Sequence, residues 1–239
     1  FYTGVNEDYQ VQVQCIAMGS PDLVTWEKYA NNPVIGTVPP ELGQTADFRD
    51  PFVWKEDDGW YMVLGSGIKG AGGVVLLYRS DNLTDWEYLH PLYTNNDRAY
   101  GTIWECPNFF KLGDKWILMI SAHSGITTDT VFYFVGDYVD HRFTPITSGV
   151  LDYGNLYASL TCLDDHNRRL MFGWIREARS EVDQRLARWS GVQSIPRILT
   201  LSEDHELMFQ PVPKLESARG QHWQSKNIAL NGTIPLEAS

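Results

Sequence analysis

The chain repeats short segments at an interval of about 56 to 60 residues, and this repeat constrains the fold more than any other feature. Pro51 and Trp60 recur as Pro107 and Trp116, 56 positions later in each case. A second motif repeats with its tryptophans, Trp26 and Trp86, 60 positions apart. A fixed interval of this length indicates one supersecondary unit used several times.

Each repeat unit has the pattern of four short strands. In the best-defined unit these are predicted at residues 51–55, 60–65, 74–79 and 86–89. They are rich in Val, Tyr, Trp and Phe and are separated by Gly, Asp and Asn turns, while helical periodicity is nearly absent. Four strands per unit at one interval predict an all-β chain built from β-propeller blades. A β-sandwich is the structural rival, but it would not repeat its strand sequences at one interval.

The repeat also predicts the domain organisation. Residues 1–212 are predicted to form an incomplete β-propeller of about three and a half blades that lacks its first blade, because a closed propeller has about four to eight. Residues 1–29 resemble the outer part of one blade, and whole blades are predicted at 48–90, 104–146 and 154–212. Residues 213–223 are predicted as a short helical linker, and 224–239 as the start of a β-sandwich that is cut off.

Composition narrows the possible ligands. The net charge of -11 excludes a basic nucleic-acid footprint and disfavours anionic membrane surfaces. No apolar run reaches the roughly 18 to 20 residues of a membrane-spanning helix. The six histidines and three cysteines are scattered without metal-ligand spacing, so we predict no metal and no cofactor. A neutral small molecule or oligosaccharide fits this composition, whereas oligomeric state and compartment, secreted or cytoplasmic, stay open.

Two carboxylates stand at the starts of corresponding strands. Asp50 precedes Pro51, and Glu105 is the counterpart of Arg49 at the 56-residue offset. Equivalent positions on adjacent blades face one central channel, so we expect Arg49, Asp50 and Glu105 to converge. Paired carboxylates are what glycoside hydrolysis requires. The competing interpretation is that both acids only make turn hydrogen bonds.

Two aromatic residues and a cysteine stand beside these acids in the sequence. Phe48 and Trp104 would offer flat faces to sugar rings, as aromatic side chains do. Cys106, the counterpart of Asp50, is interpreted as a small packed residue and not as a nucleophile, since no histidine stands beside it. The glycine-rich stretch 65–73 lacks the ending of a phosphate-binding loop and is predicted as a hairpin loop.

The motifs together resemble glycoside hydrolase family 32, the invertases, levanases and inulinases. Phe48-Arg49-Asp50-Pro51 is similar to the family's Arg-Asp-Pro motif, and Trp104-Glu105-Cys106-Pro107 to its Glu-Cys motif. Later landmarks occur in family order at residues 156–158, 173–177 and 189–197. The resemblance covers nearly the whole chain.

The resemblance implies a five-bladed propeller followed by a β-sandwich, and hydrolysis of terminal β-D-fructofuranosides, sucrose or fructans, with retention. Glu105 would be the acid/base, while Asp50 would bind fructose hydroxyls and stabilise the transition state, with Arg49 beside it. Cys106, Tyr157 and Trp174 would belong to the pocket wall.

One family motif has no counterpart in these residues. The family nucleophile is an aspartate in an Asn-Asp-Pro-Asn-Gly motif, and the nearest match, Asn31-Asn32-Pro33, lacks the acid. We therefore expect the nucleophile upstream of Phe1 and expect the 239 residues alone to be inactive. The alternatives are a fructosyltransferase on the same scaffold, a sugar-binding propeller without catalysis, and an inverting hydrolase with carboxylates about 6.5 to 9.5 Å apart.

Overall fold

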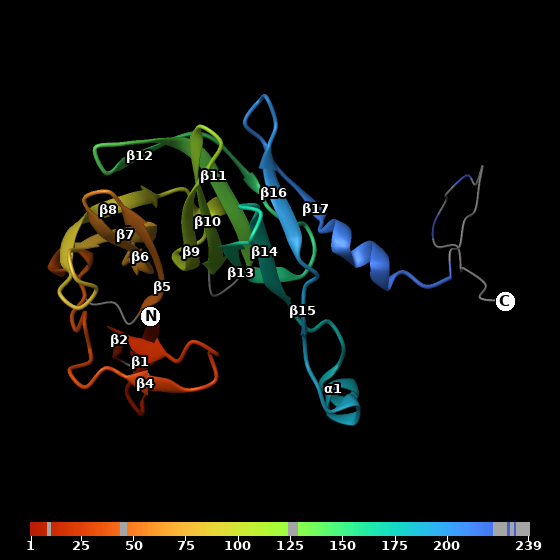
Figure 1. Cartoon of the computed structure of the whole chain (residues 1–239), viewed down its shortest axis with the longest axis horizontal. Helices are drawn as coiled ribbons and strands as arrows, with labels where there is room; N and C mark the ends of the chain where they lie inside the picture. Colours follow the sequence, from red (N-terminus) through yellow and green to blue (C-terminus); the bar gives the residue numbers. More distant parts are fainter. Residues whose placement is uncertain (9–10, 44–46, 124–128, 222–228, 230–231, 233–239) are drawn as a thin grey trace.

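Antiparallel sheets make up most of the regular structure in the computed structural model (Figure 1). The structure describes residues 1–8, 11–43, 47–123, 129–221, 229 and 232. Every strand pairing among these residues is antiparallel, which confirms an all-β chain. In the part of the chain described, no helix has the length and apolar character needed to cross a membrane.

Two four-stranded sheets coincide with the repeat units centred on the tryptophan and proline motifs. The first has the order β5 (Phe48–Glu56), β6 (Gly59–Ile68), β7 (Gly72–Ser80) and β8 (Glu87–Asn95). The second repeats this meander as β9 (Ile103–Leu112), β10 (Lys115–His123), β11 (Thr130–Val139) and β12 (Arg142–Val150). The strands of the first sheet are longer than the apolar segments predicted for them, because the ladders continue into the residues beside the turns.

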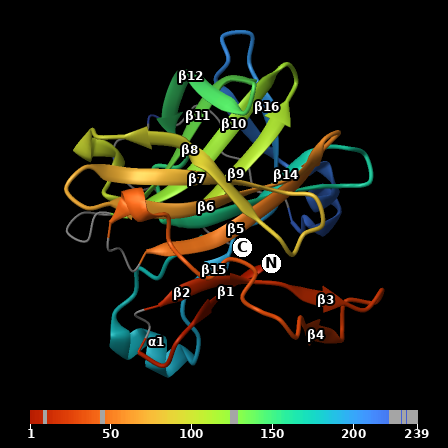
Figure 2. The same ribbon diagram turned by 90° about the vertical axis from the view of Figure 1, so that its left-hand side faces the viewer.

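A third sheet follows in chain order. It contains β13 (Leu156–Leu163), β14 (Arg169–Ile175), β16 (Arg197–Leu201) and β17 (Leu207–Pro211), with the short β15 (Val192–Gln193) beside β14. At the N-terminal end two small ladders pair β1 (Tyr2–Val5) with β2 (Gln12–Cys15), and β3 (Ala17–Gly19) with β4 (Trp26–Lys28). Figure 2 shows the three larger sheets beside one another, with the N-terminal ladders below them.

Helices are few and short. The α-helix α1 (Glu181–Ala187) lies between β14 and β15, and 3-10 turns span Pro40–Leu42, Arg98–Tyr100 and Pro213–Ala218. Helix α1 was not predicted, because its seven residues are fewer than the window over which helical periodicity can be recognised. Its start is fixed locally, since the Ser180 hydroxyl accepts from the backbone N–H of Asp183. The β-sandwich predicted for 224–239 falls almost entirely outside the described residues.

The core consists of interfaces between successive sheets. Tyr61, Val75 and Leu77 of the first sheet pack with Trp104 and Phe109 of the second. A second cluster joins the second sheet to the third, and a third cluster covers the other face of the first sheet. Aromatic residues of both sheets meet at this interface, where the ring of Trp54 in the first sheet lies 5.4 Å from that of Phe109 and 6.1 Å from that of Trp116, centroid to centroid.

The repeated Trp26 and Trp86 have a shared local role. The indole N–H of Trp26 donates to the carbonyl of Leu23, and that of Trp86 to the carbonyl of Leu83, each at 2.9 Å. Leu23 and Leu83 both have positive φ, 58° and 72°. The 60-residue repeat is therefore a turn closed by a tryptophan indole.

Close contact between the first two sheets depends on Gly65, in the middle of β6. A Cβ atom at Gly65 would lie 2.2 Å from the carbonyl oxygen of Trp104, and backbone cannot move aside as a side-chain end can. We therefore expect Gly65→Ala to lower the free energy of unfolding by about 1 to 3 kcal/mol. Gly36→Ala is the matched control, because its Cβ would only touch the Pro33 side chain at 3.4 Å. Denaturant unfolding that gave both variants the same midpoint would contradict this packing.

Candidate active site

The first strands of the three large sheets share a backbone irregularity. In β5, β9 and β13 the ladder register shifts near Asp50, Cys106 and Ala158, as in β-bulges. These three residues have φ of 62°, 46° and 50°, in the left-handed region that residues other than glycine rarely occupy. Bulges and such strained backbone are common beside active sites, where they redirect side chains.

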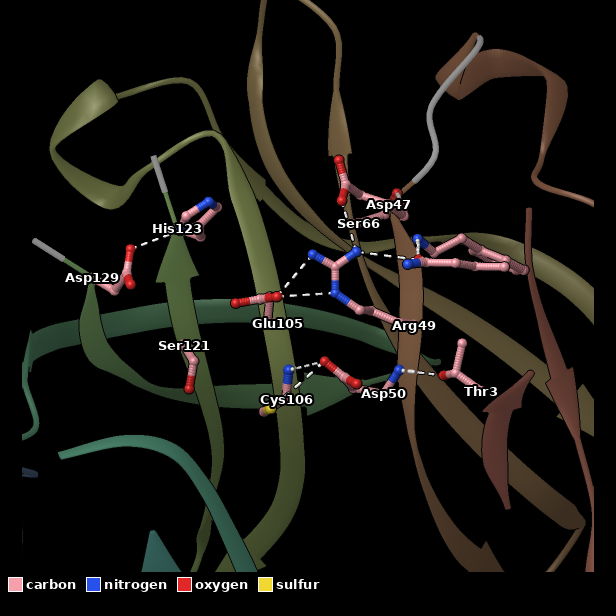
Figure 3. Close-up of polar contacts among 12 residues, drawn as sticks. Thr3, Asp47, Arg49, Asp50, Ser66, Glu105, Cys106, Ser121, His123 and Asp129 are labelled. Atoms are coloured by element: carbon pink, nitrogen blue, oxygen red, sulfur yellow. Dashed lines mark hydrogen bonds and ion pairs between the residues drawn. The ribbon is translucent and has the colours of Figure 1, made fainter. Parts of the chain in front are cut away.

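The residues that immediately precede the three bulged positions meet one another. Arg49 donates from Nε and Nη2 to Oε1 of Glu105 at 2.9 and 2.8 Å (Figure 3). The Tyr157 hydroxyl donates a short hydrogen bond to the other oxygen, Oε2. The side chains of Arg49 and Glu105 are 19% and 20% exposed, so the cluster is partly open to solvent. Residues of two strands, β5 and β13, thus hold the carboxylate on β9 through both of its oxygens.

Groups on the far side of Arg49 fix its position. Its Nη1 donates to Oδ1 of Asp47 at 2.7 Å and to Oε1 of Gln12 at 3.2 Å. The Gln12 side chain also accepts from the backbone N–H of Phe48 at 2.7 Å. The guanidinium therefore bridges two carboxylates, and each charge-assisted contact restricts its rotation.

Asp50 lies beside this cluster and is held by backbone. Its Oδ2 accepts from the backbone N–H of Cys106 at 2.9 Å, with the Cys106 Sγ 3.6 Å away. Burial raises the pKa of the Asp50 carboxyl, an effect that the Cys106 N–H and Arg49 oppose and that the Glu105 charge strengthens. Its own backbone N–H donates to Oγ1 of Thr3 at 3.0 Å.

The Cys106 side chain is suited to packing. Burial and the neighbouring charges of Asp50 and Glu105 raise the pKa of its thiol far above the usual range, so the reactive thiolate does not form at ordinary pH.

Among the described residues no group of three His, Cys, Asp or Glu side chains is arranged to hold a metal ion.

Three of the predicted substrate-contacting aromatics lie away from the cluster. Phe48 and Trp104 have no exposed surface, so neither presents a ring face to a sugar, and the expectation that they do is corrected. Both rings are used in packing: Phe48 lies near Tyr78, and Trp104 stacks on Tyr93 and donates to the Tyr100 carbonyl. Trp174 is 47% exposed and lines a separate cavity of about 240 Å³, so its place in a pocket wall stays a prediction.

Three polar residues that the sequence did not reveal, His123, Asp129 and Arg176, form a group next to the Tyr157 ring. His123 Nδ1 lies 2.7 Å from Oδ1 of Asp129, and Arg176 Nη1 donates to Oδ2 of the same carboxylate at 2.8 Å (His123 and Asp129 in Figure 3). The Arg176 guanidinium lies over the Tyr157 ring, 5.1 Å from its centroid. These residues fall at different positions within their repeats, so the 56-residue offset could not reveal them.

Comparison with known proteins identifies the family. Residues 1–211 match the model of the glycosyl hydrolases family 32 N-terminal domain. The chain is 33% identical to sucrose-6-phosphate hydrolase of Bacillus subtilis (99% of this chain, 52% of that protein) and 35% identical to fructan 1-exohydrolase of Triticum urartu (96% and 42%). It therefore spans about half the length of these relatives.

A solved structure supports the same assignment. A variant of the GH32 beta-fructofuranosidase of Bombyx mori in complex with sucrose superposes with a TM-score of 0.79 at 32% identity, covering 92% of this chain and 49% of that one. By its sequence and its structure, the chain belongs to glycosyl hydrolases family 32.

Proposed function

We propose that the whole protein hydrolyses terminal β-D-fructofuranosides such as sucrose or fructans by a retaining double displacement, with Glu105 as the acid/base. The observation that carries the proposal is the position of Glu105. Its carboxylate is partly exposed and fixed at both oxygens by Arg49 and Tyr157. A general acid must be held in reach of the leaving oxygen, and this arrangement supplies that constraint.

In this proposal Glu105 acts twice. It gives a proton to the oxygen of the leaving group while the bond to fructose C2 breaks, and it later takes a proton from the water that attacks the glycosyl-enzyme. When Glu105 gains or loses its proton, the Tyr157 hydroxyl can still donate a hydrogen bond, because it has a second acceptor in the Ser121 carbonyl at 3.3 Å. Burial raises the pKa of Tyr157 well above the usual range, so the phenol stays a donor throughout.

Asp50 supports the transition state in the same scheme. It would accept hydrogen bonds from fructose hydroxyls and balance the positive charge that develops on the sugar ring. Arg49 and Cys106 hold Glu105 and Asp50 in place, from two neighbouring strands. The nucleophile is a further carboxylate supplied from outside the 239 residues, as the length of the relatives allows.

We propose that the three sheets are blades of a five-bladed propeller, with 1–212 as its catalytic part, 213–223 as a linker and 224–239 as the beginning of a β-sandwich. The packing of successive sheets face to face supports a propeller. The names of the relatives support the substrates, since they act on sucrose 6-phosphate and fructan.

A product assay tests this function. The whole protein incubated with sucrose, 1-kestose or inulin should release free fructose from the chain end, and the 239 residues expressed alone should release none. Chromatography of the products distinguishes end-on from internal cleavage. Oligofructosides without free fructose, or no sugar release from any of the three substrates, would contradict the proposal.

A further inference from the structure

Tyr157, the residue that holds Oε2 of Glu105, is itself held by a second set of charged groups. The Arg176 guanidinium covers the Tyr157 ring at 5.1 Å, a distance at which a cation attracts the face of an aromatic ring. Tyr157 immediately precedes the bulge of β13, whereas Arg176 directly follows β14, its neighbour in the sheet. The ring therefore cannot turn away from Glu105 without leaving the cation.

Arg176 is anchored in turn from the second sheet. Its Nη1 donates to Oδ2 of Asp129 at 2.8 Å, and its Nη2 to the carbonyl oxygen of Asp129 at 3.0 Å. The side chains of Arg176 and Asp129 are 20% and 21% exposed, so the pair is shielded from solvent more than an ordinary surface ion pair. His123 contacts the remaining oxygen, Oδ1, at 2.7 Å. Both oxygens of Asp129 are thus occupied.

We propose that Arg176 and Asp129 are positioning residues for the acid/base: they fix the Tyr157 ring, and through it the orientation of Glu105 toward the leaving group. This inference rests on the proposed role of Glu105. It assigns a task to an ion pair that touches neither Glu105 nor Asp50 directly. Displacing a reacting group by about 1 Å can cost on the order of 100-fold in rate. If the Tyr157 ring is no longer fixed, we therefore expect the rate of proton transfer from Glu105 to fall most.

The fold provides a control pair with nearly the same construction. Arg197 donates to Asp152 at 2.9 Å, the two side chains are 18% and 17% exposed, and the Arg197 guanidinium lies 4.8 Å from the centroid of Phe209. Phe209 has no hydroxyl, and among the described residues neither it nor Arg197 makes a hydrogen bond, ion pair or ring contact with Glu105. Removing Arg197 therefore removes a comparable ion pair and a comparable cation–aromatic contact without touching the acid/base.

The test compares two substrates in the whole protein. Sucrose needs a proton on its leaving oxygen, whereas 4-nitrophenyl β-D-fructofuranoside releases a phenolate that needs none. The ratio kcat/KM is the quantity to compare, because it reports the first, bond-breaking step for both. We expect Arg176→Met to lower kcat/KM for sucrose about 10- to 100-fold and to change the aryl substrate little. Arg176→Lys, which keeps the cation, should recover part of the sucrose rate, and Arg197→Met should leave the ratio of the two substrates at the wild-type value.

Glu105→Gln in the same assay distinguishes a failure of the positioning role from a failure of the acid/base role. If Glu105→Gln lowered kcat/KM equally for both substrates, the assignment of Glu105 as the acid would be wrong. If Glu105→Gln were selective for sucrose while Arg176→Met behaved like Arg197→Met, the positioning role would be refuted and the proposed function would stand. If Arg176→Met does not fold, Asp129→Asn tests the proposal in its place. This variant should also lower kcat/KM for sucrose and change kcat/KM for the aryl substrate little.

Discussion

Glu105→Gln in the whole protein should reduce kcat for sucrose by about 10² to 10⁴-fold, the range over which general acid–base groups contribute. The amide keeps the shape of the carboxyl, and its single oxygen can accept from either Arg49 or Tyr157, but it has no acidic proton to transfer. The loss in kcat/KM, which reports the bond-breaking step, should be smaller for an aryl β-fructofuranoside, whose leaving group departs unprotonated. Initial rates of fructose release measure the effect.

A fold control accompanies this variant. Glu105 is one of two carboxylates bound to Arg49, the other being Asp47 at 2.7 Å, so Arg49 keeps a partner after the change. The circular dichroism spectrum and the unfolding midpoint should therefore stay close to wild type. A Glu105→Gln protein that is folded and turns over sucrose at the wild-type rate would remove Glu105 from the role of acid/base.

Asp50→Asn should have two opposite effects, a large loss of activity and a gain in stability. Removing one preorganised charge from a transition-state site typically costs about 10² to 10³-fold in kcat. The free energy of unfolding should rise by about 1 kcal/mol at neutral pH. Such a gain is common when the residue that is replaced serves activity but destabilises the folded state. The cost here is the burial of the Asp50 carboxylate, since burial is the main cause of its raised pKa.

The direction of this pKa shift also fixes the pH dependence of the gain. The pKa of Asp50 is higher in the folded chain than in the unfolded chain, so the folded state holds its proton more tightly. The contribution of Asp50 to stability is complete below the unfolded pKa and is lost as pH rises through the folded pKa. The advantage of Asp50→Asn should therefore appear at neutral pH and disappear in acid. Unfolding midpoints of both proteins across pH 3 to about pH 7 measure this, and a variant less stable than wild type at neutral pH would contradict it.

The repeat in the sequence predicts much of the site for a physical reason. Equivalent residues on successive four-stranded units occupy equivalent places, so the 56-residue offset between Arg49 and Glu105 anticipates their contact. It extends less readily to Tyr157, which follows Glu105 by 52 positions, because the connection between the second and third sheets is shorter. The bulges that aim all three side chains depend on backbone conformation, which the residue pattern does not show.

The sequence was a poor guide to which aromatic rings face solvent. Phe48 adjoins Arg49, and Trp104 adjoins Glu105, so both appear in the motifs beside the polar residues. Successive residues of a strand point to opposite faces, however. The Phe48 ring packs into the cluster on the other face of the first sheet and the Trp104 ring into the interface between the first two sheets, while Arg49 and Glu105 face the polar cluster. The helix α1 and the His123–Asp129–Arg176 group escaped prediction for a related reason, since neither follows the interval of the repeat.

The most direct test of the central claim uses Glu105→Ala and azide. With 4-nitrophenyl β-D-fructofuranoside, this variant can still form the glycosyl-enzyme in the whole protein but lacks the base that activates water. Azide needs no base, so added azide should restore turnover and yield β-D-fructofuranosyl azide, with the configuration of the substrate. That product would establish Glu105 as the acid/base of a retaining hydrolase. No rescue by azide, or an azide product of the α configuration, would contradict the account.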